Sequence, residues 1–357
     1  MHVITGLGTG GAERQMANLV AAMMADGCAD MTVVSLMPGG YYRDQLERLG
    51  VCVVDLGFGR MWPNPLGFLR LVRHIRKRKP SVIQSWMYHA DIIALVALLV
   101  SGYRKRTRMF WGVRCSDMDL TGSNLRLGLM VRLCASLSHL PDAIIFNSSS
   151  GYDVHVGRGY KPRAWHHIDN GIDTTQFAPN IEARARMRKK LGIRADAFVA
   201  VTLARMHPMK DYPTLISAMQ RIPEIKCVVA GKDTELIDGP ENLILLGERH
   251  DIADVLSAAD VMVSSSAYGE GFSNAIAEAM AVGLVIVATD VGDSARLVDK
   301  CGKIVPARDP RAIEAALREL FASGETIKQL SSHARHRVKK YFSIGAMASK
   351  YKEVYFG

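Results

Sequence analysis

Short apolar runs rich in β-branched residues alternate with helical patterns along the whole chain. The runs include VITGL, MTVVSL, SVIQSW and DAIIFNS in the first half, then AFVAVTLAR, IKCVVAG, VMVSSS and LVIVATD in the second. Strands that alternate with helices pair in parallel within βαβ units. The pattern therefore predicts an α/β fold with parallel sheets, and the length of 357 residues predicts about two domains.

A turn-rich segment at residues 157–182 interrupts this alternation and marks the domain boundary. We assign residues 1–168 to a first Rossmann-like domain and residues 169–340 to a second. Residues 341–357 form a final helix that we expect to pack back towards the first domain. The expected architecture is two Rossmann-like domains that face each other across a cleft.

The segment NPLGFLRLVRHIRKRKP, residues 64–80, carries clear helix signals. Asn64 can cap the helix, Pro65 suits its first position, and Pro80 ends it. The stripe expected to face inward consists of Phe68, Leu69, Val72 and Ile75.

Three glycines near the start, Gly6, Gly8 and Gly11, have the spacing G-x-G-x-x-G. They lie between an apolar strand and a helical pattern, so they occupy a turn where a phosphate can bind free helix amides. An NAD site also requires an acidic residue at the end of the next strand. That strand, MTVVSLMPGG, ends without one. The turn therefore predicts a phosphate site whose ligand must be identified from the rest of the chain.

The stretch SSSAYGEGFSNAIAEAMAVGLVIVATDVG, residues 264–292, points to a ligand site in the second half. Ser273 can cap a helix that runs to about Ala281, and the amides before it would face an anion. Glu270 precedes this helix and Glu278 lies within it. A solvated carboxylate is the common fate of a Glu, but this helix is almost wholly apolar and is expected to be buried. A carboxylate there needs partners, and ligand hydroxyls are suitable ones.

The loop ARMHPMKDYPTL supplies the opposite charge, with Arg205 directly after a predicted strand and Lys210 five residues later. Cations at the carboxyl end of a strand lie where α/β sheets bind their ligands. Each cation alone is equally consistent with a surface position. Together with a helix N-terminus and two carboxylates, they predict a site for a diphosphate that carries sugars at both ends.

Glu270 and Glu278 are separated by seven residues, which resembles the E-x7-E motif of the retaining GT-B glycosyltransferases of family 4, also called group 1. The resemblance covers nearly the whole chain. Its further parallels are GTGGAE at 8–13, WMYHA at 86–90, NGID at 170–173, Arg205 with Lys210, and ATDVGD at 288–293.

The resemblance implies a role for each matching residue. Arg205 and Lys210 would bind the diphosphate of a nucleotide-sugar donor, Glu278 its ribose, and Glu270 a hydroxyl of the transferred sugar. His89, for which a satisfied core histidine is the alternative, would reach the donor sugar from the other domain. The expected course is front-face attack, in which the leaving diphosphate takes the proton of the acceptor, so that neither a metal nor a cofactor is needed. The amides around the phosphates would be those of Gly10, Gly11, Gly271, Phe272 and Ser273.

Three other groups of residues have more than one interpretation. Arg114 could meet an acceptor phosphate or pair with Asp117 or Asp119. The sequence Asp117-Met118-Asp119 matches the D-x-D metal motif of GT-A enzymes, but it lies away from the donor residues, and we favour a loop near the acceptor. The pair His166-His167 has no third ligand at a helpful spacing and is interpreted as part of a linker.

The implied activity is transfer of a sugar, with a UDP-sugar favoured as donor, to a hydroxyl of a lipid-linked or polysaccharide acceptor in cell-surface glycan biosynthesis. Two alternatives stay open: a sugar-nucleotide 2-epimerase of the same fold, and a catalytically idle subunit of a membrane-associated assembly complex.

The net charge of +10 is concentrated in the first half, where residues 1–170 hold 20 Lys and Arg against 12 Asp and Glu. We expect an anionic membrane surface, and no nucleic acid, as the partner of this basic face. Scattered cysteines, the absence of a signal peptide and a longest apolar run of nine residues, Ile92–Val100, favour a cytoplasmic protein bound peripherally at the inner face of the membrane. The basic clusters are Arg73, Arg76, Lys77, Arg78, Lys79, Arg104, Lys105, Arg106 and Arg108. The segment LRLGLMVRL at 125–133 is expected to be a buried helix, with shallow membrane contact as its alternative.

Overall fold

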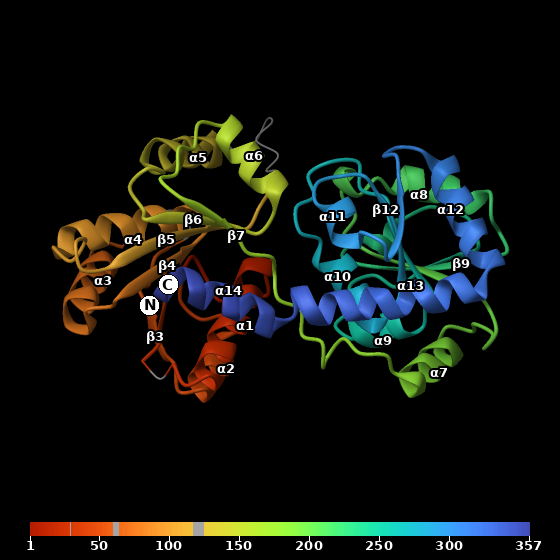
Figure 1. Cartoon of the computed structure of the whole chain (residues 1–357), viewed down its shortest axis with the longest axis horizontal. Helices are drawn as coiled ribbons and strands as arrows, with labels where there is room; N and C mark the ends of the chain where they lie inside the picture. Colours follow the sequence, from red (N-terminus) through yellow and green to blue (C-terminus); the bar gives the residue numbers. More distant parts are fainter. Residues whose placement is uncertain (29, 60–63, 117–124) are drawn as a thin grey trace. The chain divides into compact units, whose positions relative to one another are not determined.

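The computed structural model describes residues 1–28, 30–59, 64–116 and 125–357, and the chain forms two compact units (Figure 1). Unit 1 comprises Met1–Gly171 together with Ile344–Gly357, and unit 2 comprises Ile172–Ser343. The sequence had predicted these limits at residues 168/169 and 340/341. An isolated parallel bridge joins Ile172 to Ser343, where the chain enters and leaves unit 2.

Unit 1 is built on a seven-stranded sheet in the order β3-β2-β1-β4-β5-β6-β7, and its strand pairs are parallel. The strands are β1 His2–Ile4, β2 Thr32–Ser35, β3 Cys52–Asp55, β4 Val82–Trp86, β5 Arg108–Val113, β6 Ala143–Phe146 and β7 Trp165–His167. The helices are α1 Gly11–Ala25, α2 Arg43–Arg48, α3 Pro65–Arg78, α4 Tyr88–Ser101, α5 Leu125–Leu137, α6 Ser149–Gly157 and α14 Ile344–Phe356.

Unit 2 is built on a six-stranded parallel sheet in the order β10-β9-β8-β11-β12-β13. Both sheets thus contain the strand order of the Rossmann fold, as the alternating sequence pattern predicts. The strands are β8 Val199–Leu203, β9 Lys226–Ala230, β10 Leu243–Leu245, β11 Val261–Ser264, β12 Val285–Thr289 and β13 Gly302–Val305. The α-helices are α7 Ile181–Lys190, α8 Tyr212–Gln220, α9 Ile252–Ser257, α10 Asn274–Val282, α11 Ser294–Val298, α12 Pro310–Ala322 and α13 Gly324–Arg337. The short turns are η1 Pro208–Lys210 and η2 Thr234–Leu236, and a π-helical turn, η3 Val338–Phe342, follows α13.

The helix α3 begins and ends where its sequence signals place it. The Asn64 side chain accepts a hydrogen bond from the Leu66 amide at 3.1 Å, and Pro65 takes the first helical position. The inward stripe differs by one residue from the prediction: Leu71 is buried, whereas Leu69 is 53% exposed. Leu71 lies three and four residues from Phe68 and Ile75, and so it continues their face of the helix.

Helices cover both faces of the sheet in unit 1. Buried residues of α3, α4 and α5 share one core with the sheet, and those of α1 and α14 share another. The C-terminal helix α14, blue in Figure 1, belongs to unit 1, where the Tyr355 hydroxyl donates to Gln84 Oε1 at 3.0 Å. The expectation of a buried α5 is wrong for its outer side. Val131 is buried, but Leu129 is 69% exposed.

Candidate functional site

Two loops of unit 2 bring the predicted donor residues together. Arg205 and Lys210 follow β8, and Glu270 follows β11. Because β8 and β11 are neighbouring parallel strands, their carboxyl ends lie at the same edge of the sheet. This is the edge at which open α/β sheets bind ligands.

The centre of this site is an ion pair between Lys210 and Glu270. Lys210 Nζ contacts Glu270 Oε1, and the Ser266 hydroxyl donates to the same carboxylate oxygen at 2.5 Å. Glu270 is only 7% exposed, so its charge depends on these partners. A further hydrogen bond runs from the Ser265 hydroxyl to the Lys210 carbonyl at 2.8 Å, and it ties the two loops to each other. The serines were not singled out from the sequence, although the run of three at 264–266 is visible there.

Two glycines fix the backbone around these loops. A Cβ at Gly231 would lie 2.0 Å from the carbonyl oxygen of Ala204, immediately before Arg205. A Cβ at Gly292 would lie 1.9 Å from the carbonyl oxygen of Glu270, and Gly292 has a positive φ of 59°. Glycine is therefore required at both positions. Gly292 belongs to the ATDVGD segment. The family resemblance therefore pointed to this part of the chain, but it did not predict the contact between Gly292 and the Glu270 carbonyl.

The helix α10 begins beside the ion pair, as the sequence predicts. The Ser273 hydroxyl accepts from the Ile276 amide at 3.5 Å, and the helix ends at Val282 before Gly283. Ser273 and Lys210 line the same small cavity, together with the last residues of β8 and β11. The amino end of α10, with its partial positive charge, thus lies at the same cavity as the lysine.

Two residues of this segment are buried in different ways. Glu278 lies on the second turn of α10 and is only 6% exposed, as expected for a carboxylate on an apolar helix. Phe272 turns its ring into the core of unit 2, 5.5 Å from the ring of Phe342. Gly271, Phe272 and Ser273 therefore form a short segment before α10, and the buried ring of Phe272 holds this segment in place. Their assignment as phosphate-binding amides stays a prediction.

In unit 1, Gly10, Gly11 and His89 lie at the carboxyl edge of the sheet. Gly10 is the N-cap of α1 and Gly11 its first residue, whereas His89 is the second residue of α4. Their strands, β1 and β4, are paired. The Glu13 carboxylate folds back towards Gly10, since a Cβ there would lie 2.2 Å from Glu13 Oε2.

His89 follows an unusual strand-to-helix turn. Met87, two residues before it, has a positive φ of 69°, which is rare for a residue with a side chain. The His89 side chain is exposed, yet desolvation by the surrounding protein lowers the pKa of its imidazole below the usual 6.5. His89 is therefore largely neutral at pH 7 and can donate or accept a hydrogen bond.

Arg114 is held by a cluster inside unit 1. Its guanidinium donates to Asn170 Oδ1 at 2.9 Å and to the Tyr351 hydroxyl, and it lies 4.9 Å from the centre of the Trp86 ring. Burial lowers its pKa to about 10, so it keeps its charge at neutral pH. These contacts join β5 to α14 and to the end of the first segment of unit 1. The assignment of Arg114 to an acceptor phosphate stays a prediction beside this structural role.

Other candidate residues are not part of this arrangement. Asp117 and Asp119 lie outside the described residues. The interpretation of His166 and His167 as part of a linker is wrong, because both residues belong to strand β7, where they pair with β6. His167 Nε2 lies 3.2 Å from Asp169 Oδ1. Within residues 1–28, 30–59, 64–116 and 125–357, no group of three or more His, Cys, Asp or Glu side chains could hold a metal ion. In that same part of the chain, no helix is both long and apolar enough to cross a membrane.

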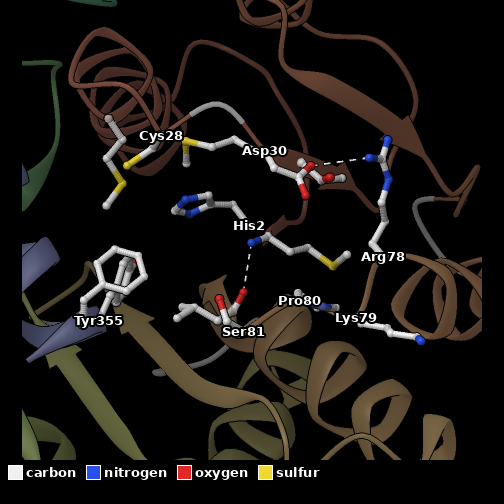
Figure 2. A pocket seen from close by; sticks show the side chains of 14 residues that line it. His2, Cys28, Asp30, Arg78, Lys79, Pro80, Ser81 and Tyr355 are labelled. Carbon is white, nitrogen blue, oxygen red and sulfur yellow. Dashed lines mark hydrogen bonds and ion pairs between the residues drawn. The ribbon is translucent and has the colours of Figure 1, made fainter.

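A separate cavity lies at the opposite, amino edge of the sheet in unit 1 (Figure 2). His2, Cys28, Asp30, Arg78 and Tyr355 are among its lining residues, and Arg78 pairs with Asp30 at 3.4 Å. Because parallel sheets bind ligands at their carboxyl ends, this cavity is not the predicted donor site.

The architecture defines the class of protein. Two units, each with a parallel Rossmann-like sheet, are the GT-B architecture of the glycosyltransferases. The family described as Glycosyltransferase Family 4 matches residues 9–176, and the family described as Glycosyl transferases group 1 matches residues 197–323. The chain belongs to the group 1 glycosyltransferases of the GT-B fold, family 4.

Relatives with named activities are distant. A UDP-Gal:α-D-GlcNAc-diphosphoundecaprenol α-1,3-galactosyltransferase of Escherichia coli is 28% identical over 207 residues, 53% of each chain. A GDP-mannose-dependent α-(1-6)-phosphatidylinositol monomannoside mannosyltransferase of Mycolicibacterium smegmatis is 29% identical over 196 residues, 48% of this chain and 51% of the relative. The chain thus spans about half the length of these curated relatives.

A solved structure shares the fold over almost the whole length. HepE of Anabaena, in complex with UDP, superposes with a TM-score of 0.82 at 17% identity, covering 99% of this chain and 98% of that one. The same protein has been solved with UDP-glucose.

Proposed function

We propose that this chain is a retaining glycosyltransferase that moves a sugar from a nucleotide-sugar donor, with UDP-sugars favoured, to a hydroxyl of a lipid-linked or polysaccharide acceptor in cell-surface glycan biosynthesis. The observation that carries the proposal is the Lys210–Glu270 ion pair at the carboxyl edge of the sheet in unit 2. Lys210 shares a cavity there with the N-cap of α10. A cation, a helix terminus and a carboxylate together match a ligand that has both a diphosphate and sugar hydroxyls.

The ion pair gives the donor a defined way to bind. Lys210 and Glu270 neutralise each other in a largely buried position. A bound donor supplies a diphosphate for Lys210 and a sugar hydroxyl that donates a hydrogen bond to Glu270, so both groups keep a polar partner. Arg205, which is exposed on the same loop, adds a second cation for the diphosphate. Glu278 is assigned to the ribose.

The proposed reaction needs no nucleophilic side chain. The acceptor hydroxyl attacks the anomeric carbon from the face that the diphosphate leaves, the bond to the diphosphate breaks, and the departing diphosphate takes the hydroxyl proton. Arg205, Lys210 and the amino end of α10 stabilise the charge that grows on the diphosphate. Neutral His89 is assigned to a contact with the donor sugar. No metal or cofactor enters these steps.

The choice of donor and acceptor is drawn from the relatives. Uridine is favoured because HepE is solved with UDP and with UDP-glucose, and because the E. coli relative is named for UDP-galactose. A lipid-linked acceptor follows from the diphosphoundecaprenol in that name and from the phosphatidylinositol of the mycobacterial relative. We place the chain peripherally at the inner face of the cytoplasmic membrane, where such lipids present their head groups.

The test is transfer with defined donors. UDP-galactose, UDP-glucose, UDP-N-acetylglucosamine and GDP-mannose are incubated with polyprenyl-diphosphate saccharides in detergent, and NMR reports the anomeric configuration of the product. We expect a product with the α configuration of the donor, and no product with Lys210→Ala.

Other outcomes identify the alternatives. An inverted product would contradict the retaining mechanism. Conversion of the free UDP-sugar to its 2-epimer without an acceptor would identify an epimerase. UDP binding without either reaction would favour an idle subunit. A thermal-shift series with UDP, GDP, ADP and NAD decides the nucleotide, because a ligand at 100 times its Kd stabilises the folded state by about 2.7 kcal/mol.

A further inference from the structure

The outward side of α4 has no charged side chain. Val96, Leu99 and Val100 are 38%, 49% and 50% exposed. The one carboxylate of the helix, Asp91, is buried and accepts a hydrogen bond from the Ser85 hydroxyl at 2.5 Å. A helix on the surface of a soluble domain normally presents polar residues to water. We call Val96, Leu99 and Val100 the apolar strip of α4. This side of the helix therefore lacks the polar residues that a helix facing only water normally presents.

The neighbouring helices widen this strip and surround it with positive charge. α3 and α5 pack beside α4 over the same face of the sheet. α5 contributes two exposed leucines, Leu129 and Leu133. Leu99 lines a shallow cavity with the basic residues of the turn at 104–108. Exposed cations on these elements include Arg73, Arg76 and Lys77 on α3, Lys105 and Arg106 in that turn, and Arg126 and Arg132 on α5.

Acidic side chains are scarce on this surface. Among residues 64–116 and 125–141, the only carboxylate is the buried Asp91. Asp142 lines the cavity beside Leu99 and is paired with Arg104 at 3.0 Å. Surfaces that face water alone usually mix both signs of charge. An apolar strip with a large excess of cations over carboxylates on its rim is complementary to the head groups and upper acyl chains of an anionic bilayer.

We propose that the outer surface of the α3–α4–α5 layer docks on an anionic phospholipid bilayer, with the apolar strip of α4 inserted among the head groups. The basic clusters supply the long-range attraction, and the strip supplies shallow apolar contact. α4 spans about 20 Å and begins beside His89 at the carboxyl edge of the sheet. A helix that lies in the membrane plane holds this edge close to the head groups, from which a lipid-linked acceptor projects. The inference deepens the proposed function and rests on its lipid-linked acceptor.

The test is co-sedimentation of the full chain with phosphatidylcholine vesicles that contain about a third phosphatidylglycerol. The wild type is expected to pellet at low salt and to be released towards 1 M salt, where the screening length falls to about 3 Å. The variant V96Q/L99Q/V100Q removes the apolar contact without changing the charge, and R73Q/K77Q/K105Q/R106Q removes charge alone. Each is expected to lower the partition coefficient about tenfold or more.

A matched control carries three Gln substitutions at exposed apolar residues of unit 2: I181Q, L236Q and F321Q. It should bind vesicles as the wild type does. Wild-type protein that stays in the supernatant at low salt overturns the proposal and leaves the surface to a protein partner. Unchanged binding by V96Q/L99Q/V100Q overturns insertion of α4. Sugar transfer by the wild type and the same variants to acceptors in detergent is measured without vesicles, so a failure of the proposed transferase activity is recognised separately from a failure of membrane binding.

Discussion

The close contact between Gly292 and Glu270 permits a sharp test of the donor site. Gly292→Ala adds one methyl group at a position where a Cβ would lie 1.9 Å from the Glu270 carbonyl oxygen. The chain offers a matched control, Gly192→Ala. Gly192 has φ 63°, close to the 59° of Gly292, but nothing lies within 4 Å of its added Cβ. The two variants share the backbone strain and differ in the contact with Glu270.

The expected magnitudes follow from these distances. An alanine at positive φ costs about 1–2 kcal/mol of folding stability, partly offset by about 0.4–1 kcal/mol from the stiffer unfolded chain. The backbone strain should therefore cost both variants about 1 kcal/mol, and Gly292→Ala should lose more because its added methyl group also overlaps the Glu270 carbonyl oxygen. To reach an ordinary contact of 3.4 Å, the Gly292→Ala backbone and the Glu270 carbonyl must separate by about 1.5 Å. A displacement of about 1 Å at a reacting centre can reduce the rate about a hundredfold.

The assay combines urea unfolding with initial rates of sugar transfer, using the donor and acceptor that the wild type accepts. Gly192→Ala should keep wild-type kcat/KM, and Gly292→Ala should lose about a hundredfold or more while still unfolding cooperatively. Glu270→Gln, which adds no atoms to the backbone contact, should show a comparable loss of activity. A folded Gly292→Ala variant with a rate within about threefold of wild type would refute the assignment of Glu270 to the donor.

Three further predictions concern the diphosphate, the metal and the pH dependence of stability. Arg205→Ala and Lys210→Ala should each lower kcat about a hundredfold or more because a preorganised cation is lost at the leaving diphosphate; near-normal rates in both would show that the donor binds elsewhere. Transfer should continue in excess EDTA, and activity that is abolished by EDTA and restored by Mn²⁺ would move Asp117 and Asp119 to the centre of the mechanism. Burial raises the pKa of Asp91 to about 7 from 3.8 in the unfolded chain, so the neutral carboxyl favours the folded state. Folding stability should fall as the pH rises from about 4 through 7, by at most about 4 kcal/mol, and urea titrations of Asp91→Asn should show a flatter pH profile than the wild type.

Local signals predicted much of the fold and part of the site. The cap of α3 by Asn64 and that of α10 by Ser273 use groups within three residues of each other, so they are visible in the sequence. The same holds for the alternation of strands and helices, because each element buries its own periodic apolar residues. The almost wholly apolar composition of α10 also predicted correctly that Glu278 is buried.

The sequence could not predict which side chains meet. Lys210 and Glu270 are 60 positions apart, and they pair because β8 and β11 are neighbours in the sheet. The close approach of Gly292 to the Glu270 carbonyl and the hydrogen bond from Arg114 to Tyr351 also join residues that are distant in the sequence. These contacts depend on strand order and helix packing, which no short segment encodes by itself.

The exposed side of α4 shows the same division between local pattern and tertiary structure. The run Ile92–Val100 is uninterrupted in its apolar character. The sequence thus determined that this run is apolar on every side, since that property belongs to its own residues. Only the tertiary structure decided that Leu95 and Leu98 enter the core while Leu99 and Val100 face outward. The reason is that a helix in one layer over a sheet can bury one side only, and the position of the sheet and of the neighbouring helices selects that side.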